Sequence, residues 1–166
     1  MRADGSFARK PCSYVLDFVS VSSSASQQVM TPEQTNLIRR SFDEMWPIRR
    51  NLAAEFYERF FEACPDARRL FPSVMGKQHL KLMDTIAALV GTLDNRALFQ
   101  SIISHTARQH ARFGVTSSQL NAFGDALTSS LEQQFGSAFT PELKQAWIAL
   151  YEAVKTDMLS AGKIQT

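Results

Sequence analysis

The sequence predicts an all-α protein of six or seven helices joined by short connections, and three observations support this fold class. Apolar residues recur at three- and four-residue steps, and no segment alternates apolar and polar residues as a half-buried strand does. The chain contains 12 Phe but only 7 Gly and 6 Pro, a balance that favours long helices over turn-rich sheets. The signal Thr-Pro-Glu occurs at Thr31 and Thr140. It combines a capping hydroxyl, a proline at the first helical position and a carboxylate at the positive helix end.

The 166 residues fit one domain of ordinary size, preceded by a segment of different composition. Residues 1–29 are rich in serine, and their apolar patch at 14–21 is interrupted by Asp17. We expect a disordered extension here, because such a segment buries too little apolar surface to offset its ordering entropy. A signal peptide is disfavoured by Asp17 and by the lack of a clean small-residue cleavage site. Two alternatives for this segment stay open, namely that it is a tether and that the chain truly starts at Met30. The folded domain is predicted over residues 30–166.

Four helical segments are predicted in the first half of this domain. The first begins at Pro32 and ends before Pro47, because a proline ring clashes with the preceding helical turn. The next segment is unusually aromatic, with large apolar residues at four-residue steps. Pro65 breaks that segment and starts a short helix. The fourth helix covers about residues 75–90, and Gly91 provides its stop.

Three longer helices are predicted in the second half. One runs from about Arg96 to Phe113 and stops at Gly114. A second covers about residues 117–135 and carries a leucine and phenylalanine face. The last begins after the second capping signal at Thr140 and continues to the end of the apolar pattern.

Composition excludes several classes of partner. Lys plus Arg is 18 and Asp plus Glu is 16, and no like-charge run is long enough to indicate a nucleic-acid or membrane surface. No apolar stretch approaches the roughly 20 residues that cross a bilayer. Two cysteines, Cys12 and Cys64, are too few for a disulfide framework and suit a reducing compartment, so a cytoplasmic location is expected. The sequence also has no Gly-rich phosphate loop and no G-x-S-x-G nucleophile turn.

Three histidines are the candidate metal ligands. His79 and His105 have polar neighbours and are expected to be solvated, whereas His110 shares the apolar phase of its helix with Ile103. On spacing alone, a core histidine bonded to a carbonyl is the simpler interpretation of His110. His105 and His110 are five residues apart and lie on different helix faces, which argues against a zinc site.

Several stretches together resemble bacterial single-domain globins and the globin domain of flavohaemoglobins. Residues 56–61, with Pro65-Asp66 and Leu70-Phe71-Pro72, look like the second helix and the corner after it. Residues 78–83 resemble the distal helix and residues 109–115 the proximal segment, while residues 139–151 are similar to the last helix of that group and of neuroglobin. The joint register is the specific part of this resemblance. Tyr57 to Phe71 spans 14 residues and Gln78 to His110 spans 32, as in the family pattern. The likeness covers about residues 31–162 and implies a globin fold around a haem pocket.

The resemblance implies haem b held by His110 as the proximal iron ligand, with the opposite position open for dioxygen or another diatomic gas. It also implies a set of residues around the haem. Phe71 would lie against the porphyrin, and the walls would be formed by Leu82, Phe61, Phe123 and Val115. For Phe61 and Phe123, a place in the plain hydrophobic core is an equal alternative.

Tyr57 and Gln78 are interpreted as a distal pair. A phenol and a carboxamide on an apolar wall need a polar partner, and bound dioxygen carries partial negative charge that accepts hydrogen bonds. Lys81 could reach a haem propionate or remain solvated. Counting 32 residues back from His110 selects Gln78 as the residue that faces the iron. Ferrous iron without a gas is then predicted to be five-coordinate. In the competing register, shifted by one residue, His79 would turn inward instead.

The function implied by the resemblance is reversible binding of dioxygen for storage, transport or scavenging, more simply by a non-enzymatic protein than by an enzyme. The alternatives are a nitric oxide dioxygenase served by a separate reductase and a haem-based gas sensor. Two positions depart from the flavohaemoglobin pattern, which has a Tyr and a Glu where this chain has Leu120 and approximately Gly162. Without an anionic partner for His110, peroxidase-like chemistry is disfavoured.

Overall fold

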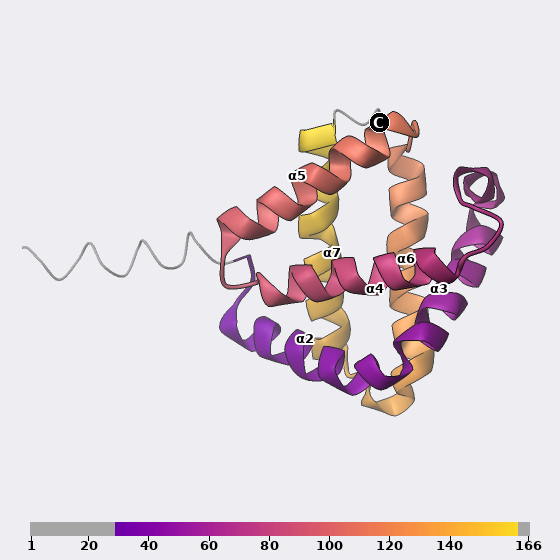
Figure 1. The fold of residues 1–166 in the computed structure, drawn as a ribbon. Helices are drawn as coiled ribbons and strands as arrows, with labels where there is room; N and C mark the ends of the chain where they lie inside the picture. Colours follow the sequence, from indigo (N-terminus) through magenta and orange to yellow (C-terminus); the bar gives the residue numbers. More distant parts are fainter. Residues whose placement is uncertain (1–28, 163–166) are drawn as a thin grey trace, which may run out of the picture.

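The computed structural model describes residues 29–162, and within them the chain forms six α-helices and three short 3-10 helices (Figure 1). The elements are α2 (Pro32–Met45), η1 (Trp46–Ile48), α3 (Arg49–Ala63), η2 (Pro65–Leu70), α4 (Gly76–Gly91), α5 (Arg96–Arg112), α6 (Ser117–Phe135), η3 (Gly136–Ala138) and α7 (Pro141–Gly162). No strand occurs in this part of the chain, which confirms the all-α prediction. The expected N-terminal extension lies outside the described residues except for Val29. The Val29 N–H donates to the Leu93 carbonyl at 3.2 Å.

The capping and proline signals act where the sequence places them. The Thr31 hydroxyl accepts from the Gln34 N–H at 3.2 Å, and the Gln34 side chain accepts in return from the Thr31 N–H. Thr140 caps α7 by accepting from the Leu143 N–H at 3.3 Å. Pro47 lies in η1 and Pro65 opens η2, so the short helix predicted after Pro65 is a 3-10 helix. Each proline lacks the N–H that a continuous α-helix would need.

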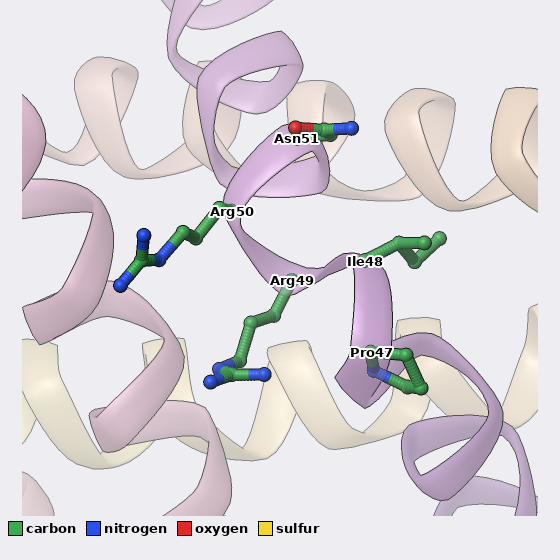
Figure 2. Close-up of a pocket in the computed structure, with 5 residues that line it drawn as sticks. All are labelled: Pro47, Ile48, Arg49, Arg50 and Asn51. Carbon is green, nitrogen blue, oxygen red and sulfur yellow. The ribbon is translucent and has the colours of Figure 1, made fainter.

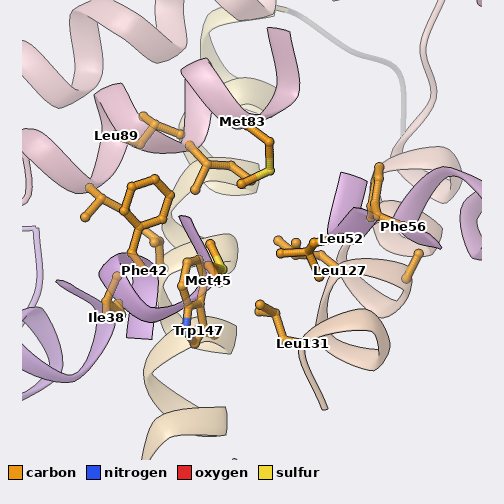
Figure 3. Packing of buried hydrophobic residues seen from close by; sticks show 14 of the residues in the cluster. Ile38, Phe42, Met45, Leu52, Phe56, Met83, Leu89, Leu127, Leu131 and Trp147 are labelled. Carbon is orange, nitrogen blue, oxygen red and sulfur yellow. The ribbon is translucent and has the colours of Figure 1, made fainter. Parts of the chain in front are cut away.

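The helices bury one core, in which α5 packs mainly against α7 and α3 against α6. Figure 3 shows buried side chains from α2, α4 and α7, among them Met45 and Trp147, facing buried side chains from α3 and α6. The Trp147 indole N–H donates to the Ser41 hydroxyl at 3.0 Å, and that hydroxyl donates to the Ile38 carbonyl at 3.0 Å. Because both polar groups are buried, this chain of hydrogen bonds removes the desolvation penalty that either would otherwise carry.

A tyrosine joins α6 and α7 closely. The Tyr151 hydroxyl donates to the Leu120 carbonyl at 2.6 Å, and its ring stacks on Phe123 with the centroids 5.7 Å apart. A Cβ atom at Gly124 would overlap the Tyr151 ring, so only glycine allows this approach. Burial raises the pKa of Tyr151, with a smaller contribution in the same direction from Glu152.

Helices α4 and α5 are joined by the turn at residues 92–95 and diverge from it in Figure 1. The Asn95 side chain caps α5 by accepting from the Leu98 N–H at 3.1 Å. Gln78 lies in the first turn of α4 and His110 in the last turn of α5, so both lie toward the ends of these helices that are remote from the turn. Across residues 29–162, none of the helices has both the length and the apolar character that crossing a bilayer requires.

Candidate functional site

The environment of His110 defines the tautomer of its imidazole. Its Nδ1 atom lies 2.8 Å from the carbonyl oxygen of Thr106, one helical turn earlier in α5. A carbonyl can only accept, so Nδ1 carries the proton and donates, and the lone pair of Nε2 is left available. The ring is half-buried, and Val115, after the positive-φ residue Gly114, contacts the same segment through its N–H and the His110 carbonyl at 3.5 Å. His110 therefore presents one nitrogen in the form that ligates a metal.

Tyr57 and Gln78 are brought together by the packing of α3 against α4. The Gln78 Nε2 atom donates to the Tyr57 hydroxyl oxygen at 3.2 Å, so the phenol's own proton is free for another acceptor. Tyr57 is 3% exposed, and burial raises its pKa while the bond from Gln78 acts in the opposite direction. The phenol thus stays protonated at neutral pH and remains a hydrogen-bond donor.

The predicted aromatic residues form one cluster around Tyr57. Phe71 meets the Tyr57 ring edge to face at a centroid distance of 5.5 Å, and Phe61 lies 5.7 Å from it. Phe123 of α6 extends the cluster through Phe56 and Phe60, at 4.6 and 5.6 Å. The cluster is a largely apolar wall, which strengthens any hydrogen bond that the Tyr57 hydroxyl makes.

Arg68 holds the corner that carries Phe71. Its guanidinium donates to the carbonyls of Phe71 at 3.1 Å and Pro72 at 3.0 Å, and more weakly to that of Ser73. The guanidinium carbon also lies 5.3 Å from the centroid of the Phe61 ring. The corner between η2 and α4 therefore has its backbone acceptors satisfied by one side chain, which fixes the position of Phe71.

The remaining predicted residues of α4 have different environments. Leu82 is half-buried against the core, and Lys81 is exposed. His79, expected to be solvated, is instead half-buried, and its ring stacks on Tyr57 with centroids 5.4 Å apart and planes inclined by 19°. The expectation for His79 is wrong because helix packing brings the Tyr57 ring face against it, whereas His105 is exposed as expected.

A surface pocket of about 260 Å³ lies at a different place, at the corner between η1 and α3 (Figure 2). It is lined by Pro47, Ile48, Arg49, Arg50 and Asn51. The Arg49 guanidinium donates to the Trp46 carbonyl at 2.8 Å and lies 4.5 Å from the centre of the Trp46 ring. Through these contacts Arg49 stabilises the corner between η1 and α3. None of the predicted site residues lines the pocket.

The donor set fits a haem. Haem iron in oxygen-binding proteins takes one imidazole nitrogen, and the Thr106 carbonyl leaves Nε2 of His110 in the required form. An apolar aromatic wall with one phenol and one carboxamide fits the gas-binding side. Two contributors were missed from the sequence, Thr106 and Arg68, and His79 was considered only as a solvated residue or an alternative distal residue, without its stack on Tyr57. Thr106 could have been found, because it lies four residues before His110 in the predicted helix. A stack such as that of His79 on Tyr57 leaves no signal in the sequence.

The fold and this arrangement define a globin, and comparison with known proteins agrees. The Globin family model matches residues 54–158, which is more than half of the chain, so the chain belongs to the globin family. It is also similar to the flavohemoprotein of Vibrio cholerae serotype O1, with 27% identity over 126 residues. The match covers 74% of this chain and 32% of that relative, so the matched part spans about a third of the relative's length. Membership of this family implies a haem cofactor.

Proposed function

We propose that this chain binds haem b through His110 and uses it to bind dioxygen reversibly, for storage, transport or scavenging. The observation that carries the proposal is the pair formed by Tyr57 and Gln78. The amide donates to the phenol oxygen at 3.2 Å, and the phenol keeps a free proton inside an apolar wall. A protonated donor in such surroundings stabilises a partly negative gas ligand and slows its release.

The proximal side supports reversible binding over oxidative chemistry. Haem, when bound, would supply the iron that binds the gas, and His110 would hold that haem. The Nδ1 partner of His110 is a neutral peptide carbonyl rather than a carboxylate. A neutral partner leaves the imidazole a weaker electron donor than an anionic partner would, which favours release of the gas intact.

The first experiment tests haem binding through one substitution and one control. His110→Ala should prevent stable haem incorporation, because no other described residue at the end of α5 offers an imidazole. His105→Ala, which removes an exposed imidazole from the same helix, should retain the wild-type Soret absorbance. An unchanged Soret band in His110→Ala would contradict the ligand assignment.

A second candidate function is that of a nitric oxide dioxygenase supplied with electrons by a separate reductase. The similarity to a flavohemoprotein favours it, because that name pairs a flavin with a haem. Both functions would use the same site residues, so only an assay of catalytic turnover can distinguish them. Consumption of nitric oxide by the haem-loaded chain, with dioxygen and an added flavin reductase, would support the dioxygenase over simple oxygen binding.

A further inference from the structure

Two neighbouring residues of α4 contact the same phenol in different ways. Gln78 donates to the Tyr57 hydroxyl, and His79 stacks its imidazole on the Tyr57 ring at a centroid distance of 5.4 Å. Successive residues on an α-helix are about 100° apart, so a single small side chain could not meet both. Tyr57 can contact both Gln78 and His79, because its ring face and its hydroxyl lie at different points of one large, buried side chain.

The imidazole differs from the other rings around Tyr57. Phe56 and Phe61 belong to α3, the same helix as Tyr57, and Phe71 belongs to the corner that Arg68 holds. Among the described ring contacts of Tyr57, that of His79 comes from α4, the helix that also carries Gln78. The two contacts from α4 therefore fix both the plane of the phenol ring and the position of its oxygen.

We propose that His79 is a positioning residue for gas binding: its stack on Tyr57 holds the phenol ring so that the hydroxyl points at the gas ligand. The inference rests on the proposed function, because the orientation of the hydroxyl has a consequence only where a ligand accepts its proton. The strength of a hydrogen bond falls steeply with misalignment. Rotation of the ring about its Cβ–Cγ bond leaves the hydroxyl oxygen in place, but it turns the direction in which the O–H bond points, because a phenol O–H lies in the plane of the ring. His79 acts through the planar shape of its ring and does not bind the iron.

The experiment compares His79→Phe, which keeps a planar ring, with His79→Leu, which does not. In the haem-loaded protein, His79→Leu should speed dioxygen dissociation by about 5-fold or more, while His79→Phe stays within about 2-fold of wild type. The C–O stretching frequency of the carbon monoxide complex should shift in His79→Leu toward its value in Tyr57→Phe. In the Tyr57→Phe background, His79→Leu should have no further effect on the rate, because the two residues act as one unit. The control His105→Leu removes an exposed imidazole and should change none of these quantities.

The haem-free protein supplies a readout that does not depend on gas binding. The ring signals of Tyr57 in a ¹³C-tyrosine NMR spectrum, identified by their loss in Tyr57→Phe, should move in His79→Leu and less in His79→Phe. Wild-type dissociation in His79→Leu, or an effect that persists fully in the Tyr57→Phe background, would overturn the inference. A low-spin ferrous spectrum lost in both His79 variants would instead identify His79 as an iron ligand and overturn it too. If the chain takes up no haem, the proposed function fails and this inference with it. If haem is taken up and Tyr57→Phe acts as expected while His79→Leu does not, only this inference fails.

Discussion

Replacing Tyr57 by Phe isolates the contribution of a single proton to gas binding. The ring is 3% exposed and is surrounded by Phe56, Phe61, Phe71 and His79, so phenylalanine keeps the packing. The substitution removes the hydroxyl whose proton is free to reach the ligand. A hydrogen bond to a charged acceptor contributes about 1.5–3 kcal/mol, which corresponds to roughly a 10- to 100-fold change in an equilibrium constant.

This change should appear mainly in the dissociation rate of dioxygen. The hydrogen bond forms after the ligand has entered, so its loss destabilises the bound state and leaves entry nearly unchanged. Stopped-flow mixing of the oxygenated protein with dithionite and carbon monoxide measures the rate. A dissociation rate within about twofold of wild type would refute the role of Tyr57, since even the weak end of the range predicts about tenfold.

Tyr151→Phe is a matched control for the same assay. Tyr151 is a half-buried phenol, but its hydroxyl already donates to the Leu120 carbonyl at 2.6 Å and belongs to the contact between α6 and α7. Removing it should lower the free energy of unfolding by about 1 kcal/mol and leave the dioxygen dissociation rate near wild type. Equal effects of the two substitutions on dissociation would show that the assay reports general packing.

Three further outcomes concern stability. Gly124→Ala should lower the free energy of unfolding by about 1–3 kcal/mol, because the new methyl group overlaps the Tyr151 ring, and Tyr151→Leu in the same chain should recover part of the loss in a thermal melt. The pKa of Tyr151 is raised on folding, so above its ordinary value of 10.0 the unfolded chain releases a proton that the folded chain keeps. The free energy of unfolding should therefore be unaffected by this group below pH 10 and fall as the pH rises above it, with a shallower fall in Tyr151→Phe; equal slopes in urea titrations would contradict this. Deleting residues 1–28 should shift the Tm by no more than a few degrees, because their composition predicts little buried apolar surface; a larger loss would show that they pack on the domain.

Local signals in the sequence were sufficient to predict the helices. Capping threonines and prolines act over three or four residues, so Thr31 and Pro65 could be interpreted without knowing the tertiary structure. The apolar repeats likewise identified the buried faces, because burial follows the helical period. The short helix predicted to start at Pro65 is confirmed, and its 3-10 type was left open, since a six-residue segment carries too few hydrogen bonds for its sequence to distinguish a 3-10 from an α-helix.

The site was harder to predict from the sequence than the helices were, because its contacts join residues of different elements. Tyr57 and Gln78 are 21 residues apart, and only the family register suggested that they face each other. The polar neighbours of His79 in the sequence favoured solvent, while the Tyr57 ring that covers it comes from another helix. Arg68 resembles any exposed arginine in the sequence, and its role depends on how the chain turns around it after η2.

The close approach of α6 and α7 at Gly124 also constrains how this chain can vary. A side chain at position 124 overlaps a tyrosine at position 151, so a substitution of Gly124 requires a compensating change at position 151, whereas Tyr151 can change while Gly124 is kept. A chimera that joins α6 of a homologue to α7 of this chain must therefore carry glycine at the position of Gly124, whereas the reverse chimera meets no such restriction. A crossover between these helices is thus sterically tolerated in one direction and penalised in the other.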